Sequence, residues 1–274
     1  MEVPGGYDNK LVVCICEMLG TAFLLIGVNW GGTTGNTPIA VGLIVMGMAQ
    51  MVGPISGGHF NPAVTMGMFV KELGKPTNHV SWKQNLVFAL IIILSQIAGG
   101  ILGVLIVPLG LKLETRIDTQ LPTPPTNYIT QLCPAHGCDD HGQHLTKVFW
   151  VEIFMTFFFV STVIAIVKHN GSKDMPVNAI AIGISLYTTI MIAGGLSGGA
   201  INPAVGLVQP IFQKVYNEKV FPNAPKTSLV YQPAYIFGPA IGGILAGVYS
   251  RIVVEAGVAA AEKARETYAP EFRK

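Results

Sequence analysis

The chain has 274 residues, of which 50% are hydrophobic and only 12% are charged, and its mean hydropathy is +0.51. Globular domains in water carry about 25% charged residues, so this composition excludes a water-soluble fold and indicates a membrane protein. A net charge of +2 without any dense block of lysine or arginine gives no basis for a nucleic-acid partner, and none is expected.

Six apolar runs follow one another along the chain. They cover residues 11–29, 38–53, 84–108, 147–167, 176–196 and 230–254. A helix needs about 20 apolar residues to cross the hydrocarbon core of a membrane, so we predict six transmembrane helices, the second of them short. The first run does not resemble a cleavable signal peptide, because it has no basic start beyond Lys10 and contains Glu17. The expected fold class is an all-α membrane protein.

Basic residues between the runs predict the orientation of the chain in the membrane. If both termini are cytoplasmic, 11 lysine and arginine residues lie in the inner segments and 6 lie in the outer segments. Cytoplasmic segments are usually the richer in these residues. We therefore predict a cytoplasmic N-terminus over residues 1–10 and a cytoplasmic tail over residues 255–274. The tail pattern predicts a short amphipathic helix followed by charged residues.

Three landmarks occur twice, in the same order and at nearly constant offsets of 135, 141 and 143 residues. The pairs are Glu17 with Glu152, Asn-Pro-Ala at 61–63 with Asn-Pro-Ala at 202–204, and Gly99-Gly100 with Gly242-Gly243. Each copy contains three spans. Because three is an odd number, the second copy enters the membrane from the opposite face, which makes the repeat inverted. The predicted parts are a first repeat over 11–108, an outer connecting loop over 109–146 and a second repeat over 147–254.

Each Asn-Pro-Ala motif is followed by an apolar piece too short to span the membrane. About ten residues at 1.5 Å each reach only halfway across. We therefore predict that each motif lies on a re-entrant loop that leads into a half-helix. Asn61 and Asn202 are suited to cap these half-helices, and Pro62 and Pro203 fall at the first helical position, where a missing N–H costs nothing. Ala63 and Ala204 complete the two motifs.

Two re-entrant loops from opposite faces bring two half-helix N-termini together near the middle of the membrane. Their positive ends oppose the passage of cations and protons, while the Asn61 and Asn202 amides can donate to a passing oxygen. Irregular backbone at this depth has to line a wet cavity or be buried in protein. The carbonyls expected to accept hydrogen bonds belong to Gly57, Gly58, His59, Gly198, Gly199 and Ala200. The pattern predicts a single-file pore for water or small polyols.

Glu17 and Glu152 place a carboxylate inside a predicted span, which is costly unless the carboxylate has a partner. The unpaired N–H groups of the re-entrant loops are the natural donors. We predict that the two glutamates brace these loops. A proton relay is the other reading, but the spans contain no further chain of acidic, histidine or lysine side chains to continue it.

With two Asn-Pro-Ala motifs, a repeated glutamate and six apolar runs, the chain resembles the aquaporin (major intrinsic protein) family over about residues 11–252. The resemblance implies the aquaporin fold, six transmembrane helices plus two re-entrant half-helices. It also implies a passive channel in a lipid bilayer, no enzyme activity, no cofactor, and a homotetramer with one pore in each subunit. Small-residue faces such as Gly99/Gly103 and Gly243/Gly247 are expected to allow close helix packing.

The resemblance places a second constriction at four positions, Val41, Ile190, Gly199 and Val205. Water-selective members typically carry an aromatic residue, a histidine and an arginine at the first, second and fourth of these. Glycerol channels usually have aspartate after that arginine, where this chain has Gly206. The departure predicts a wider, apolar outer filter that passes water and small uncharged solutes such as glycerol.

Two other functions stay open at this point. An apolar ring can also close by dewetting, so a closed, structural or junction-forming member of the same fold is the alternative to a conducting channel. A secondary transporter also fits an inverted repeat, although the spans show no paired charges for ion coupling beyond Glu17 and Glu152. No nucleophile and base are placed to form an enzyme site.

The outer connecting loop contains Cys133, Cys138, His141 and His144. Cys133 and Cys138 can form a disulfide in an oxidising compartment. Two thiols with two imidazoles can instead hold a tetrahedral metal, although the spacing matches no standard zinc motif. The sequence leaves open a disulfide, a metal site or neither.

Overall fold

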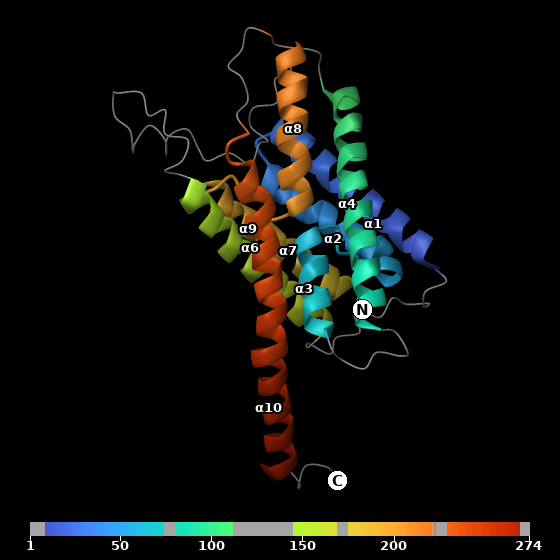
Figure 1. Ribbon diagram of the computed structural model, residues 1–274, viewed down its shortest axis with the longest axis vertical. Coiled ribbons are helices and arrows are strands. Elements are labelled where there is room, and N and C mark those ends of the chain that lie inside the picture. The colour runs from blue at the N-terminus through green and yellow to red at the C-terminus, as the bar shows by residue number, and fades with distance from the viewer. Residues whose placement is uncertain are drawn as a thin grey trace.

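A computed structural model describes residues 9–73, 81–111, 145–168, 175–220, 222 and 229–268. Within these ranges the chain forms a bundle of helices (Figure 1). Six of the described helices are long and apolar enough to cross a membrane. They are α1 (Lys10–Gly32), α2 (Thr37–Ser56), α4 (Trp82–Gly110), α6 (Leu145–Lys168), α7 (Met175–Gly194) and α9 (Gln232–Tyr249). Each contains most of one predicted run, so the prediction of six spans is confirmed.

Two further helices begin directly after the Asn-Pro-Ala asparagines. They are α3 (Pro62–Glu72) and α8 (Pro203–Val220). With 11 residues, α3 is about 16 Å long, which is half the thickness of a membrane core. In Figure 1 the two helices extend in opposite directions from the middle of the bundle. This is the arrangement that an inverted repeat with two half-helices requires.

The helix α8 is longer than the half-helix of about ten residues that its apolar stretch predicted, because it has 18 residues and continues through Pro210. A proline inside a helix removes a single N–H and strains one turn, and neighbouring contacts can hold the helix together. Here a polar stripe at four-residue spacing, formed by Gln209, Gln213 and Asn217, is buried on both sides of Pro210. Gln209 exchanges two amide hydrogen bonds of 2.8 Å with Asn29 on α1, which fixes α8 to the first span.

The two halves pack their first and third spans in the same way. In the first half, a side chain at Gly99 on α4 would collide with the Met18 carbonyl on α1. In the second half, a side chain at Gly242 on α9 would collide with the Ile153 carbonyl on α6. Met18 and Ile153 each directly follow one of the repeated glutamates. Equivalent glycines therefore receive equivalent backbone, which allows close packing of the spans.

The second predicted small-residue face lies on α9. Gly243 meets the backbone of Ala63, and Gly247 meets the backbone of Gly67, both on α3. The half-helix α3 is therefore seated against α9 along one side. Gly103 on α4 plays the same part toward Ala22 on α1.

The last span does not end at the edge of the bundle. A π-helical segment (Ser250–Val254) connects α9 to α10 (Glu255–Tyr268), and Figure 1 shows α10 projecting away from the other helices. Around this segment, Arg251 donates to the Leu73 carbonyl, and the Glu255 carboxylate lies 2.9 Å from the buried Lys71 ammonium. The amphipathic helix predicted in the tail is thus present as a continuation of the sixth span, tied to the end of α3.

Candidate pore

Each half-helix is preceded by a non-helical loop that turns back sharply. The turn is made by pairs of glycines with positive φ, Gly57 and Gly58 at 90° and 62° and Gly198 and Gly199 at 101° and 74°. Glycine adopts these angles without a steric penalty because it has no Cβ atom. The residues predicted to supply pore carbonyls lie in these two loops.

Both asparagines of the motifs cap their half-helices, as the sequence predicted. The Asn61 Oδ1 atom accepts from the Ala63 N–H, and the Asn202 Oδ1 atom accepts from the Ala204 N–H, each at 2.9 Å. Each cap satisfies one of the free N–H groups at a helix start. All four residues are buried.

The two motifs are also bonded to each other across the centre of the bundle. The Asn61 Nδ2 group donates to the Ile201 carbonyl at 2.9 Å, and the Asn202 Nδ2 group donates to the Phe60 carbonyl at 3.0 Å. Each asparagine therefore holds its own half-helix with its oxygen and the opposite loop with its nitrogen. The spacing of residues along the chain gives no sign of these reciprocal bonds.

The residue before each asparagine has a left-handed backbone, with φ of 49° at Phe60 and 53° at Ile201. Such angles are uncommon outside glycine, and for a β-branched residue such as isoleucine they are an outlier that stores strain. Both residues are held on either side, because a glutamate accepts from the N–H and the opposite asparagine donates to the carbonyl. This strained conformation also escaped prediction from the sequence.

Glu17 is fully buried beside the first loop and accepts four hydrogen bonds. Its Oε1 atom accepts from the Ser56 hydroxyl at 2.8 Å and from the His59 N–H at 2.9 Å. Its Oε2 atom accepts from the Phe60 N–H at 2.7 Å and from the Gln96 amide at 2.8 Å. Four donors offset the cost of burying a carboxylate in the membrane.

Glu152 occupies the equivalent place beside the second loop and is also fully buried. Its Oε1 atom accepts from the Ser197 hydroxyl at 2.6 Å and from the Ala200 N–H at 3.1 Å, and its Oε2 atom accepts from the Ile201 N–H at 2.8 Å. Tyr235 on α9 donates its hydroxyl to the Ser197 carbonyl. These three donors to Glu152 correspond to the Ser56, His59 and Phe60 donors to Glu17.

The first loop carries a side-chain network that the second does not repeat. The His59 ring is buried, and its Nδ1 atom lies 3.1 Å from the Thr65 hydroxyl. The Gln96 amide donates to that hydroxyl at 3.0 Å as well as to Glu17. The second loop has Ala200 in place of His59. Gln96 is a partner that sequence reasoning missed, because a lone glutamine in an apolar run has no recognisable pattern.

The four positions assigned to the outer filter come from α2, α7 and the second loop. Val41 and Val205 are 2% and 5% exposed and belong to one hydrophobic cluster, against which the partly buried Ile190 packs. Gly199 lies in the loop of that same second motif with a φ of 74°. The three apolar side chains thus belong to, or pack on, a core cluster that extends through the bundle, and none of the four residues carries a charge.

The sequence candidates in the outer connecting loop, Cys133, Cys138, His141 and His144, lie outside the described residues. In the part of the chain that the structure describes, no three His, Cys, Asp or Glu side chains converge on a metal position. Cys14 and Cys16, both on α1, are free thiols.

Six spans, two opposed half-helices and two cross-bonded loops define a membrane channel protein built from an inverted duplication. The sequence model for the major intrinsic protein family matches residues 9–250, so the chain belongs to this family. Members of the family are passive channels and not enzymes. The predicted family membership is confirmed, and with it a multi-pass membrane location and a passive channel for water or small solutes.

Several relatives of known name are similar over nearly the whole chain. The glycerol uptake facilitator protein-like 6 of Lactiplantibacillus plantarum is 27% identical over 86% of this chain and 91% of its own length. The putative aquaporin NIP4-1 of Arabidopsis thaliana is 29% identical over 92% and 81%. The aquaporin Z of Photorhabdus laumondii is 25% identical over 92% and 95%.

A solved structure shares the fold. The X-ray structure of the aquaglyceroporin from Plasmodium falciparum superposes with a TM-score of 0.71 and covers 92% of this chain and 99% of its own, at 19% identity. The predicted aquaporin fold is therefore confirmed.

Proposed function

We propose that the chain forms a single-file pore through which water and small uncharged solutes such as glycerol cross a lipid bilayer. The observation that carries this proposal is the reciprocal bonding of Asn61 and Asn202 to the carbonyls of Ile201 and Phe60. An asparagine amide has two N–H groups. One N–H of each amide bonds to the opposite loop, and the other can donate to a solute oxygen at the same point.

The half-helices supply the barrier against ions. The N-termini of α3 and α8 begin at Pro62 and Pro203, directly beside the cross-bonded asparagines. Each helix start carries about half a positive charge. Two such ends at one constriction repel cations and protons, while neutral solutes pass between the asparagine donors and the loop carbonyls.

The apolar outer filter broadens the range of solutes. At Val41, Ile190, Gly199 and Val205 the chain offers neither a fixed cation nor the bulk of an aromatic ring. Selection by hydrogen bonds and by size is therefore weak there. The relatives include proteins named as a glycerol uptake facilitator and as aquaporins, and both solutes fit this filter.

One observation favours the second candidate, a closed or structural member of the fold. Val41 and Val205 are nearly inaccessible and share a hydrophobic cluster with Ile190 packed against it. A constriction lined by apolar side chains can exclude a water column by dewetting. A direct permeability measurement separates the two candidates.

The test compares water and glycerol permeability of vesicles that contain the native chain, Val205→Arg or the uncharged control Val205→Met. A native channel is expected to exceed empty vesicles in both assays. Arginine adds bulk and charge at the filter, so we expect glycerol permeability to fall by roughly tenfold, the discrimination that one steric contact typically gives, with a smaller loss for water. Val205→Met is expected to change the two permeabilities in similar proportion.

Two results would contradict this scheme in different ways. Native vesicles that swell no faster than empty ones in either solute would establish the closed member of the fold. Native conduction with an unchanged solute profile in Val205→Arg would remove Val205 from the filter and leave the channel proposal standing.

The proposal includes assembly and orientation. We infer a homotetramer with one pore in each subunit, both termini in the cytoplasm, and a repeat organisation over residues 11–108 and 147–254. The excess of lysine and arginine in the inner segments supports the orientation. Exposed aromatic side chains on α6, such as Trp150 and Phe154, offer an apolar face that lipid or a second subunit can cover.

A further inference from the structure

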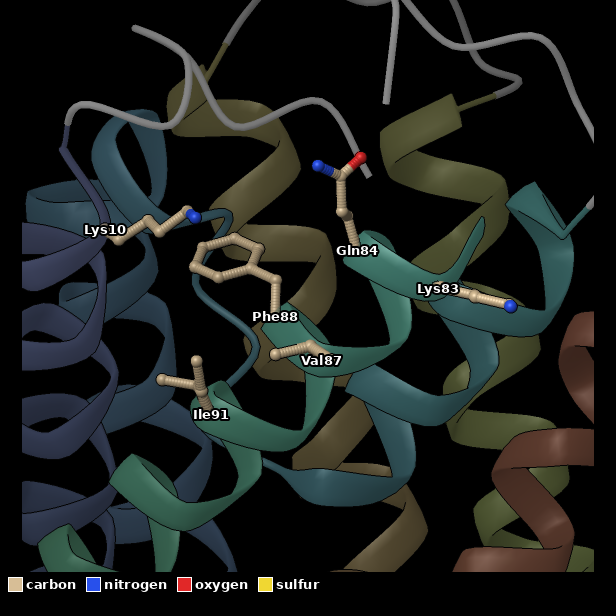
Figure 2. A pocket seen from close by; sticks show the side chains of 6 residues that line it. All are labelled: Lys10, Lys83, Gln84, Val87, Phe88 and Ile91. Atoms are coloured by element: carbon tan, nitrogen blue, oxygen red, sulfur yellow. The ribbon is translucent and has the colours of Figure 1, made fainter. Parts of the chain in front are cut away.

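The helix α1 is packed differently at its beginning and in the middle of the bundle. At the beginning, a pocket of about 450 Å³ opens between α1 and α4, and Figure 2 shows Lys10 of α1 beside the Phe88 ring of α4 there. Further along α1, at Gly20, a ring from the first pore loop lies directly on the helix backbone.

This ring belongs to Phe60, the residue with a left-handed backbone directly before Asn61. A Cβ atom added to Gly20 would lie 2.7 Å from the Phe60 Cγ atom and closer still to two other ring atoms. A glycine is therefore required for the ring to lie here. We call the space over Gly20 that the ring occupies the Gly20 slot.

The Phe60 ring is enclosed on its other sides as well. Phe60 is fully buried, in a cluster with Met48 on α2 and Ala179 on α7. The far edge of the ring lies close to Gly58 of its own loop, where an added Cβ atom would be 3.5 Å from the Phe60 Cζ atom. Because protein interiors are close-packed, a methyl group at Gly20 has to move the loop and cannot simply turn the ring.

A moved loop changes a hydrogen bond of the pore. The Phe60 N–H donates to Glu17 on α1, and the Phe60 carbonyl accepts from the Asn202 amide of the second half. Phe60 thus lies between α1 and the second motif. A push away from Gly20 drives the Phe60 carbonyl toward Asn202, so the constriction between the two motifs narrows.

The second half distributes its side-chain volume in the opposite way. Gly20 is the third residue after the first repeated glutamate and corresponds to Met155, while Phe60 corresponds to Ile201. Met155 packs against the cluster that contains Ile201. A glycine on the helix therefore accompanies a large residue in the first loop, and a large residue on the helix accompanies a smaller one in the second loop.

We propose that Gly20 is a positioning residue of the pore, which acts through the Phe60 ring and sets where the Phe60 carbonyl meets Asn202. The inference rests on the proposed function, since the Asn202 amide is the group assigned there to the solute. The slot thereby selects by size among small uncharged solutes. A first loop closer to the second motif passes only smaller ones.

The experiment measures the ratio of glycerol to water permeability in vesicles that contain Gly20→Ala. The narrower constriction is expected to lower this ratio by roughly tenfold, the discrimination that one methylene group typically gives in a fitted site. Gly20→Met/Phe60→Ile copies the pair of the second half and is expected to return the ratio toward the native value. Phe60→Leu, which empties part of the slot, is expected to raise the ratio.

The matched control is Gly103→Ala on α4. Its methyl group meets Ala22 and Leu25 on the same helix α1, and not the loop. This variant is expected to lower the thermal unfolding midpoint and to leave the permeability ratio unchanged. It separates crowding of α1 in general from crowding of the Gly20 slot.

A second readout does not depend on conduction. Deuterium exchange of the backbone amides in residues 57–60 reports the bond of the Phe60 N–H to Glu17. We expect exchange there to become about fivefold faster in Gly20→Ala, the effect of one lost hydrogen bond, and to stay native in Gly103→Ala.

Three results would overturn the positioning role. The first is a native permeability ratio together with native loop exchange in Gly20→Ala. The second is a double variant with no recovery, and the third is a ratio in Gly103→Ala that falls as far as in Gly20→Ala. A native chain that conducts neither solute would contradict the proposed function instead, and loop exchange would still decide whether the slot holds the loop.

Discussion

At the scale of single residues, the two loops are held by groups that lie far apart in the sequence. Phe60 and Ile201 keep their left-handed backbone because a buried carboxylate binds each N–H and an asparagine of the other motif binds each carbonyl. Strain of this kind persists only where the surroundings fix it from several sides. The two glutamates therefore act by fixing the conformation of the loops. Because both carboxylates are fully buried, neither is exposed to a solute.

We predict that Glu17→Ala strongly destabilises the protein. The change leaves the buried N–H groups of His59 and Phe60 without their acceptor, along with the Ser56 hydroxyl and one Gln96 donor. An unsatisfied buried donor costs about 1–3 kcal/mol, so the total is expected to reach at least about 3 kcal/mol. The measurement is the thermal unfolding midpoint of the detergent-purified protein. The midpoint of Glu17→Gln is expected to fall between those of the native chain and Glu17→Ala.

The matched control is Glu218→Gln, which removes a carboxylate from an i,i+4 pair with Lys214. Both side chains are more than a third exposed, and such pairs contribute about 0–1 kcal/mol. A Glu17→Ala protein as stable as this control would show that the loop holds its shape without the carboxylate.

The sequence predicted the residues of the site better than their partners. Asn61 and Asn202 could be recognised as helix caps because a cap depends on residues only two or three positions away. Gln96 and the pair of Asn29 with Gln209 could not, because these hydrogen bonds join residues far apart in the chain. Their geometry exists only once the helices have packed.

At the scale of helices, close packing depends on where a glycine faces a neighbour. Gly99 on α4 faces the Met18 carbonyl on α1, and there is no room between them for a methyl group. Gly47 on α2 faces open space. Both positions hold a helical glycine, but only Gly99 is packed against another helix, so the two can be compared directly.

We predict that Gly99→Ala lowers stability and that Gly47→Ala does not. The methyl group of Gly99→Ala forces α4 away from the backbone of α1, which cannot move aside. We expect this to lower the free energy of unfolding by about 1–3 kcal/mol. The second gains helix propensity worth about 0.5–1 kcal/mol. The stability of both variants is measured by heating the detergent-purified protein and recording the temperature at which its single size-exclusion peak is lost. Equal effects of the two substitutions would mean that α1 and α4 adjust freely.

The length of α8 shows where the apolar pattern reaches its limit. The pattern predicted a half-helix because apolar residues stop near Pro210, and the helix in fact continues to Val220. Directly before the proline Gln209 is hydrogen-bonded to Asn29, and beyond it Gln213 and Asn217 are buried. An apolar run indicates which segment can lie in the membrane. It predicts the end of a helix only where the helix and the run end at the same residue.

At the scale of the whole molecule, the halves are separate in sequence and joined at the pore. Equivalent glycines pack equivalent backbone within each half, yet each loop bonds across to the other half. The overall fold could be predicted from the sequence because the repeated residues can still be recognised there at nearly constant offsets. The contact between halves could not, since no residue pattern encodes it.

We predict that the channel can be assembled from two separate chains, residues 1–120 and 121–274, made together in one cell. Each piece contains three spans and one loop, and neither contains the partner that its loop carbonyl needs. Copurification of the pieces and solute permeability are expected only when both are present. The Asn61→Ala/Asn202→Ala pair, which removes both cross bonds, is expected to weaken copurification. Conduction by either piece alone would contradict this account.

The reciprocal bonds between the loops also set an order of events during synthesis. The Phe60 carbonyl has its partner at Asn202, 142 residues later, so a ribosome that has just released the first three spans has not yet made it. Before Asn202 is inserted, Phe60 has its N–H bonded to Glu17 but its carbonyl has no donor from the second motif. The first loop therefore cannot reach its final conformation at this stage, because an unpaired carbonyl and a strained backbone in the membrane are both costly. The channel is therefore finished from its last third, when translation delivers the second motif to the first.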